Sequence, residues 1–274
     1  MDAFCKSLCL LLALAWSQQC TAPKQAAHLP SPRLVWSDEF DRPGLPDSTR
    51  WTYDSGTGCP DLCGWGNQEL QHYTAARPQN ARVEGGCLLI EAQREDWQGS
   101  RYTSARLLSK HKGDWKYGRI EARIKCPVGR GTWPAFWMLP THWAYGGWPR
   151  SGEIDIMEHV GYQPDSVYGT VHTQAFNHLK NTQRSGALYL PDAEQAFHLY
   201  AIEWRPDRID FFVDDLKYHS FANLQRSPDE WPFDQPFHLI LNLAVGGGWG
   251  GKKGVDDSIW PRRMEVDYVR VYAW

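Results

Sequence analysis

The sequence predicts an all-β fold, a sandwich or jelly roll built from short antiparallel strands. Apolar and polar residues alternate in several segments, which is the pattern of strands that bury one face. The chain holds 24 Gly and 18 Pro residues among its 274, and they separate these segments at short intervals. No stretch has the sustained 3.6-residue apolar period of an amphipathic helix. A single domain of this kind fits the length.

Four segments justify the strand prediction. In the segment 86–95, Leu88, Ile90 and Ala92 alternate with Leu89, Glu91 and Gln93, which predicts one buried face. The segment 207–218 is predicted to form two strands around a turn at Asp214 and Asp215. The segment 264–274 is predicted to form an alternating strand at the end of the sequence. The segments are GCLLIEAQRE (86–95), YGRIEARIKC (117–126), DRIDFFVDDLKY (207–218) and MEVDYVRVYAW (264–274).

The N-terminus is typical of a secretory signal peptide. Lys6 precedes the apolar run LCLLLALAW, which is too short to span a bilayer and is followed by small residues. We expect a signal peptide at 1–17, with cleavage between 17 and 22, and a Pro/Ala/Gln-rich tether at 18–32. The catalytic or binding domain is then 33–274. No second apolar run of spanning length follows, so a secreted, extracellular protein without a membrane segment is predicted.

Charge and composition exclude some partners and favour others. The formal net charge is −3, and no Lys/Arg tract offers a surface for nucleic acid. The 15 Trp, 12 Tyr and 10 Phe residues exceed what core packing alone explains and indicate an aromatic-lined cleft. Such flat aromatic rings pack against sugar rings, lipids or bases, although packing remains the simpler explanation for any single aromatic residue. We expect the protein to be a monomer.

Seven cysteines divide by position. Cys5 and Cys9 leave with the signal peptide, and Cys20 leaves or stays according to the cleavage site. The other four predict two disulfides in an oxidising compartment, for which three connectivities exist. We favour Cys59–Cys63 as a loop staple and Cys87–Cys126 as a tie between strands. A zinc site is the alternative, but one C-x3-C pair without matching His or Cys residues indicates it weakly.

The segment SGEIDIMEHVG (151–161) places Glu153, Asp155 and Glu158 in an apolar run. A strand suits the β-branched Ile154 and Ile156 better than a helix does. On a regular strand the third acid, at offset 5, faces away from the other two. One extra residue at a β-bulge, for which the flexible Met157 is a plausible place, returns it to their face.

Two of these carboxylates, brought together on one face, suit the chemistry of retaining glycosidases. There one carboxylate attacks the anomeric carbon while another, about 5–5.5 Å away, protonates the leaving oxygen. An acid between them repels both and so tunes their pKa values. A solvated polar face and a cation site are alternative readings of the same three residues.

Upstream of the acids, GTWPAFWMLPTHWAYGGWPRSG (131–152) gathers four Trp residues. Together with further motifs along most of the chain, it resembles glycoside hydrolase family 16, particularly its laminarinase-like endo-β-1,3-glucanases. The six-residue acidic motif is longer than the E-x-D-x-E of the lichenase-type members. The other matching motifs are LVWSDEF, WGNQELQHYT, YTSARLLSK, YGRIEARIK, GEIDIMEHVG, YGTVHT, FHLYAIEWRPDRIDFFVDD, NLAVGGGWGG and VDYVRVY.

The resemblance implies a concave jelly-roll sandwich of two antiparallel sheets and retaining hydrolysis of β-1,3-glucan. It implies Glu153 as nucleophile, Glu158 as general acid/base and Asp155 as the assisting acid, with no cofactor required. The sugar-binding residues that it implies are Asn67, Arg106, Trp148, His172 and Trp249, with Trp133 and Trp137 as further candidates that core packing also explains. A structural calcium site, present in some members, corresponds to Glu39, the Gly85 backbone and Asp267.

Other readings of the sequence are excluded or left open. The segment GGGWGGKK (246–253) nearly matches a phosphate loop, but Lys253 stands where Ser or Thr is needed and no helical pattern follows. A glucan-recognition protein without activity remains an alternative, although relatives of that type generally lack the acids present here. The same chemistry on mixed-linkage glucan or a marine galactan also remains open, because cleft loops decide such preferences.

Overall fold

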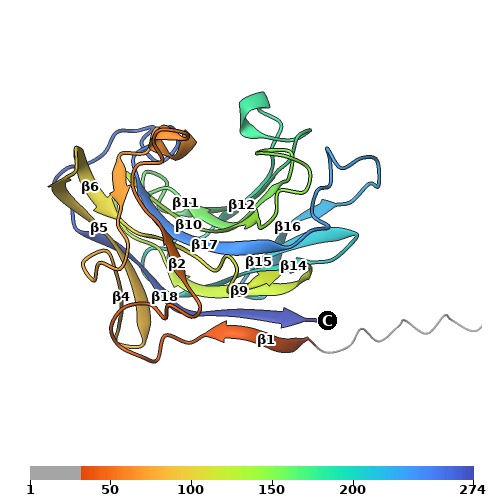
Figure 1. Cartoon of the computed structure of the whole chain (residues 1–274), viewed down its shortest axis with the longest axis horizontal. Coiled ribbons are helices and arrows are strands. Elements are labelled where there is room, and N and C mark those ends of the chain that lie inside the picture. Colours follow the sequence, from red (N-terminus) through yellow and green to blue (C-terminus); the bar gives the residue numbers. More distant parts are fainter. Residues whose placement is uncertain (1–31) are drawn as a thin grey trace, which may run out of the picture. The chain divides into compact units, whose positions relative to one another are not determined.

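The computed structural model describes residues 32–274, and these form the predicted all-β jelly-roll sandwich (Figure 1). The expected signal peptide at 1–17 and nearly all of the expected tether at 18–32 lie outside the described residues. Two sheets of ten and eight strands face each other. No helix among the described residues is long and apolar enough to cross a membrane.

The ten-stranded outer sheet runs in the order β16-β15-β14-β9-β18-β5-β6-β3, with β1 added on β18 and β4 on β5. Its long central strand β18 closes the chain, and it pairs with β1, β5 and β9. The strands are β1 (Arg33–Asp38), β3 (Gln71–Tyr73), β4 (Ala81–Glu84), β5 (Cys87–Trp97), β6 (Ser100–Ser104), β9 (Gly118–Lys125), β14 (His198–Trp204), β15 (Arg208–Val213), β16 (Leu216–Ala222) and β18 (Arg262–Ala273).

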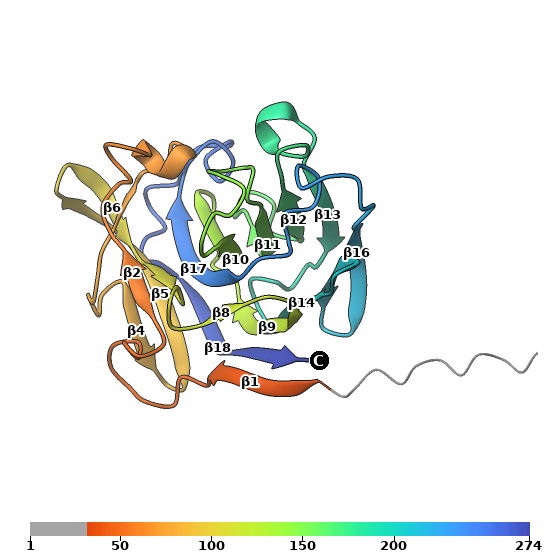
Figure 2. The same cartoon turned by 45° about the vertical axis from the view of Figure 1, so that its right-hand side comes forward.

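The eight-stranded inner sheet runs in the order β13-β12-β11-β10-β17-β7-β2, with β8 paired to β17. Its middle strands form the concave floor seen in Figure 1 and, turned by 45°, in Figure 2. The strands are β2 (Thr52–Asp54), β7 (Arg106–Leu108), β8 (Asp114–Trp115), β10 (Thr132–Pro140), β11 (Glu153–His159), β12 (Ser166–His172), β13 (Arg184–Tyr189) and β17 (Phe237–Val245). Two 3-10 turns, η1 (Cys63–Gly66) and η2 (His178–Lys180), rise on opposite sides of this floor.

The core lies between the sheets, as the alternation predicts. Along β5, Leu88, Ile90 and Ala92 are fully buried. Along β10, Phe136 and Met138 point into the core, so that their sequence neighbours face the other side of the sheet. The inner sheet thus has one apolar face against the outer sheet and one face free to carry chemistry.

The four segments named in the sequence become β5, β9, the β15–β16 hairpin and β18. The hairpin turns at Asp214 and Asp215, as predicted. One pairing departs from the antiparallel prediction, because β3 and β6 run parallel. These two strands are joined through β4 and β5 rather than by a tight turn, and a connection of that length permits the parallel arrangement.

Only one of the two favoured disulfides is correct. Cys59, in the loop before η1, is bonded to Cys63, the first residue of η1. Cys87 and Cys126 are both free thiols, and the prediction that they pair is wrong. Strand β18 lies between β5, which begins with Cys87, and β9, which ends before Cys126. Two strand spacings of roughly 4.8 Å separate them, beyond the ~7 Å limit for bridged Cα atoms.

Candidate active site

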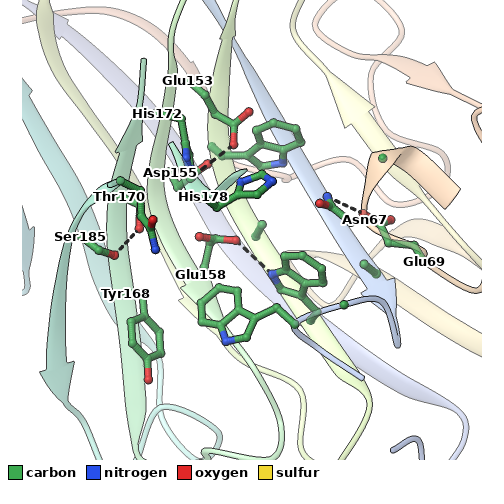
Figure 3. A pocket seen from close by; sticks show the side chains of 18 of the residues that line it. Asn67, Glu69, Glu153, Asp155, Glu158, Tyr168, Thr170, His172, His178 and Ser185 are labelled. Carbon is green, nitrogen blue, oxygen red and sulfur yellow. Dashed lines mark hydrogen bonds and ion pairs between the residues drawn. The ribbon is translucent and has the colours of Figure 1, made fainter. Parts of the chain in front are cut away.

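The concave face of the inner sheet carries a cleft of about 680 Å³. Its floor comes from alternate residues of β10, β11, β12 and β17, among them the three acids labelled in Figure 3. Residues of the loops near η1, η2 and residue 249 line its walls. Glu153, Asp155 and Glu158 all line it. The strand prediction for residues 151–161 is therefore correct, and the three acids share one face.

The shared face depends on a bulge in β11. Asp155 pairs with Thr170 and Glu158 with Tyr168, so that two residues of β11 oppose the single Gly169 of β12. The register also shifts against β10 in the same place. The two residues at the bulge, Ile156 and Met157, are both buried in the core. The extra residue predicted at Met157 is thus present at 156–157.

Glu153 and Asp155 surround the imidazole of His172. His172 Nε2 lies 3.3 Å from Asp155 Oδ2 and 3.8 Å from Glu153 Oε1. The indole nitrogen of Trp148 donates a hydrogen bond to Glu153 Oε2 at 2.8 Å. Glu153 therefore has a donor on one oxygen and an imidazole near the other, which orients it and stabilises its charged form.

Glu158 lies among aromatic side chains on the floor of the cleft. Its Oε1 accepts a hydrogen bond of 3.0 Å from the indole nitrogen of Trp133. The ring of Trp249 packs edge-on against Trp133 at 5.6 Å and against Tyr168 at 5.1 Å. Burial of Glu158 in this part of the cleft disfavours its charged form and so raises its pKa.

Burial raises the pKa values of all three acids, and the charge of Asp155 raises those of Glu153 and Glu158 further. Desolvation, followed by the charge of Asp155, raises the pKa of Glu153 to about 8. The same two causes hold the pKa of Glu158 well above its ordinary value, and burial raises the pKa of Asp155. His172 acts against them by lowering the pKa values of Glu153 and Glu158. Such a set holds protons near neutral pH, as acid/base chemistry requires.

Comparison with known proteins identifies the family. The family model of glycosyl hydrolases family 16 matches residues 69–270. The chain belongs to this family.

A β-glucanase of Rhodothermus marinus is 58% identical over 248 residues, covering 88% of this chain and 85% of its own. The X-ray structure of the laminarinase from Rhodothermus marinus superimposes with a TM-score of 0.86 at 57% identity, covering 90% of this chain and 99% of its own. A non-specific endo-β-1,3(4)-glucanase of the family has a TM-score of 0.84 at 44% identity, covering 90% and 97%. That crystal presents 1,3-β-D-cellobiosyl-glucose at its active site.

Most residues predicted to bind sugar lie in the cleft of this family 16 domain. The lining includes Asn67, Trp133, Trp137, His172 and Trp249. Trp133 and Trp137 belong to the cleft rather than the core, because they alternate on β10 with the buried residues. Both rings are partly exposed.

Two of the predicted sugar-binding residues stand behind the lining. Trp148 reaches the site through its hydrogen bond to Glu153. Arg106 is buried, pairs with Asp54 at 3.1 Å and packs its guanidinium between the rings of Trp65 and Trp137, at 4.7 and 4.8 Å. Arg106 therefore supports Trp137 and does not line the cleft. Sequence motifs cannot separate a side chain that lines a cleft from one that holds the lining in place.

The sequence reasoning missed Glu69, which also lines the cleft. Its carboxylate accepts hydrogen bonds from Gln71 at 2.6 Å and Tyr73 at 3.2 Å. Asn242 donates to the Tyr73 hydroxyl at 3.0 Å and accepts from the Trp137 indole at 2.7 Å. A continuous hydrogen-bonded chain thus links Glu69 to the Trp137 ring. Glu69 stands in the motif WGNQELQHYT, which was the available signal.

The wall formed by η2 was also missed. His178 lines the cleft, with its ring centroid 5.0 Å from that of Trp148 and 5.2 Å from that of His172. The adjacent Leu179 is 72% exposed at the cleft margin. Nothing in the local sequence marks these residues, because only the fold carries their loop to the nucleophile side.

The residues predicted for calcium are engaged in other contacts. Arg270 donates to both oxygens of Glu39, at 3.0 and 2.8 Å, and Arg123 donates to Asp267 at 2.6 Å. Gly85 occupies the β4–β5 turn with a φ of 62°, a conformation that favours glycine. These carboxylates are already neutralised by guanidinium groups, so the donor set does not fit a cation in this arrangement.

Proposed function

We propose that this protein is a secreted endo-acting hydrolase of β-1,3-glucan that works by double displacement with retention. The observation that carries the proposal is the placement of Glu153, Asp155 and Glu158 together on the floor of an aromatic cleft. The laminarinase and endo-β-1,3(4)-glucanase relatives support the choice of substrate class. We expect the protein to act as a monomer and without a cofactor.

In the first step, an oxygen of Glu153 attacks the anomeric carbon while Glu158 protonates the departing glycosidic oxygen. The C–O bond to the leaving sugar breaks as the bond to Glu153 forms, giving a covalent glycosyl-enzyme. Trp148 holds Glu153 Oε2 at 2.8 Å, which leaves Oε1 to attack. The raised pKa of Glu158 supports its role as the proton donor.

In the second step, Glu158 is a carboxylate and removes a proton from water, which attacks the same carbon from the vacated side. The bond to Glu153 breaks, and the product leaves with its original anomeric configuration. Trp133, at 3.0 Å from Glu158 Oε1, fixes the orientation of this group in both steps. Glu158 regains its proton as the cycle closes.

Asp155 and His172 prepare the nucleophile. Asp155 is only 3% exposed and stands between the other two acids, so its protonation decides how strongly it repels each of them. A proton held by Asp155, together with the His172 imidazole 3.8 Å from Glu153, favours the ionised nucleophile. The pair therefore sets the charge of the site rather than attacking the substrate.

The aromatic rings account for binding of a sugar chain. Trp133, Trp137 and Trp249 present partly exposed faces along the cleft, and flat rings pack well against the apolar faces of pyranose units. Asn67 stands at one wall and His172 at the other, where each can bind hydroxyl groups. A chain lying across the floor passes over the acids, as internal cleavage requires.

The test is release of reducing ends from laminarin by the purified protein. Wild type is expected to release them, while Glu153→Gln abolishes release and keeps most of the binding to insoluble β-1,3-glucan. Following the anomeric protons by NMR during hydrolysis is expected to show the β-anomer first. Activity that survives in Glu153→Gln, or is absent from folded wild type, contradicts the assignment and favours the non-catalytic recognition protein.

Substrate preference needs a panel measured on the same preparation. Laminarin is expected to give the highest kcat/KM, followed by lichenan, with agarose and carrageenan inert. A higher value on lichenan would move the assignment to mixed-linkage glucan, and cleavage of agarose or carrageenan would move it to a galactan. Cleavage of the leader between residues 17 and 22, read by N-terminal sequencing of secreted protein, tests the location.

A further inference from the structure

Three side chains at one end of the cleft present a group of metal-ligand atoms. Glu153, Asp155 and His172 each offer one ligand atom, and these atoms all lie within 4.8 Å of one another. They come from neighbouring strands, since Glu153 on β11 pairs with His172 on β12. The backbone therefore fixes their spacing, as in a built site.

The distances suit a small tetrahedral cation. Metal–ligand bonds of about 2.0–2.2 Å at tetrahedral angles place ligand atoms roughly 3.4 Å apart. His172 Nε2 already lies 3.3 Å from Asp155 Oδ2 and 3.8 Å from Glu153 Oε1. For these two pairs closure needs side-chain movements of a few tenths of an ångström. The ligand atoms of Glu153 and Asp155, which lie within 4.8 Å of each other, come to the same spacing, and the fourth position is left open toward the cleft.

The unsatisfied atoms of the site give independent support. Asp155 is 3% exposed, and its buried Oδ2 makes no well-aligned hydrogen bond within residues 32–274; its close contact there is the ion pair with His172 Nε2 at 3.3 Å, inside the same cluster. A cation bound between these atoms would satisfy the buried carboxylate oxygen. A divalent ion also removes the repulsion between the two carboxylates.

The ligand set selects the class of metal. One imidazole and two carboxylates are typical of zinc and neighbouring transition metals, whereas Mg²⁺ and Ca²⁺ prefer oxygen ligands in larger number. His172 Nδ1 is buried without a partner in the described part of the chain. A hydrogen-bond acceptor at the second ring nitrogen of a histidine usually strengthens its binding to a metal. Because Nδ1 has no such acceptor among residues 32–274, we expect the affinity for the metal to be about 10- to 100-fold weaker than that of a site with one.

We propose that Glu153, Asp155 and His172 bind one divalent transition-metal ion, with Zn²⁺ as the reference, in direct competition with the sugar substrate. The ion binds Glu153 Oε1, the oxygen to which Trp148 does not donate a hydrogen bond. This oxygen then cannot attack the anomeric carbon. The expected inhibition of glucan hydrolysis rests on the proposed function, whereas the expected binding of the metal ion does not.

Binding is tested by titrating ZnCl₂ into metal-free protein in a calorimeter. Wild type is expected to bind one equivalent, while MgCl₂ and CaCl₂ give no comparable heat. Asp155→Asn, His172→Gln and Glu153→Gln are each expected to lose this equivalent. The matched control is His111→Ala with His142→Ala, which removes an exposed histidine pair whose rings lie 6.2 Å apart, and it is expected to bind Zn²⁺ as wild type does.

Inhibition is tested by laminarin hydrolysis at several Zn²⁺ concentrations. The apparent KM is expected to rise about 11-fold at ten times the Zn²⁺ Kd, with kcat unchanged and EDTA restoring the original value. Retention of the bound equivalent in all three variants, absence of binding by wild type, or a fall in kcat alone overturns the proposal. Three separate variants keep the test decisive if one of them fails to fold. Metal-free wild type that binds Zn²⁺ but cleaves no glucan would instead refute the proposed function.

Discussion

Trp148 and Glu153 form the contact that orients the proposed nucleophile, with the indole nitrogen 2.8 Å from Oε2. Trp133 makes the corresponding contact to Glu158 at 3.0 Å. Each carboxylate thus has its own indole donor, supplied by residues five positions before Glu153 and 25 before Glu158 in the chain. The two contacts allow the two acids to be perturbed separately.

Trp148→Phe removes the donor to Glu153 and keeps an aromatic ring. A hydrogen bond to a charged group contributes about 1.5–3 kcal/mol, so kcat/KM on laminarin is expected to fall roughly 10- to 100-fold. Because the hydrogen bond lowers the pKa of Glu153, its loss raises that pKa, and the acidic limb of the kcat/KM profile moves to higher pH. Trp133→Phe is the control, since it acts on Glu158. An unchanged acidic limb in Trp148→Phe contradicts the assigned contact.

Glu153→Gln is expected to stabilise the fold increasingly as pH rises. The folded pKa of Glu153, about 8, exceeds its ordinary value of 4.5, so the folded state holds more protons between these values and stability falls as pH rises through them. A Gln side chain does not titrate, so the stability of Glu153→Gln does not fall with pH for this reason. With about 1.4 kcal/mol per pKa unit as the upper bound, we expect a gain of about 2 kcal/mol at pH 8 and little at pH 5.

The measurement is urea unfolding of both proteins at pH 5 and pH 8. Glu84→Gln is the control, because Glu84 is exposed and the hydrogen bond from Arg82 lowers its pKa. It is expected to show no gain at pH 8. Equal unfolding midpoints of wild type and Glu153→Gln at both pH values would rule out a raised pKa at Glu153.

Deletion of Met157 is expected to convert the bulged strand into a regular one without losing the site. Ile156 then pairs with Phe136 and opposes Gly169, and Glu158 stays opposite Tyr168, on the cleft face. Loss of a fully buried Met costs about 2–5 kcal/mol of stability. Reduced but measurable activity on laminarin is therefore expected from folded protein.

Deletion of both Ile156 and Met157 is the contrasting variant. It places Glu158 at offset 3 from Glu153, where it faces the core, and activity is expected to vanish. Circular dichroism and thermal unfolding report whether each deletion variant folds. Inactivity of a folded single-deletion variant would show that the bulge itself, rather than the shared face, is needed.

Glu69→Ala is expected to loosen the far end of the cleft. It breaks the hydrogen-bonded chain through Tyr73 and Asn242 to Trp137, so the ring loses its fixed orientation. We expect KM for laminarin to rise several-fold while kcat falls less, because the acids stay in place. Glu69→Gln is expected to recover most of the affinity, since an amide oxygen still accepts hydrogen bonds. A selective loss of kcat would place Glu69 in the chemistry itself.

The sequence by itself determined much of this protein. Period-2 alternation predicted β5, β9, the β15–β16 hairpin and β18, because burial of one face is a local property of a strand. The offset of Glu158 predicted the bulge, since strand geometry leaves no other way to bring it beside Glu153. Cys59 and Cys63 were paired correctly because they are only four positions apart and a local loop can close.

Only the tertiary structure decided features that depend on which strands become neighbours. Insertion of β18 between β5 and β9 keeps Cys87 from Cys126, and no spacing in the chain reveals that order. The parallel pairing of β3 with β6 has the same origin. Arg106 behind Trp137 and His178 beside His172 are long-range contacts, and a residue's own neighbours in sequence do not encode such packing. Local periodicity fixes which way a side chain faces, whereas the fold fixes what it meets.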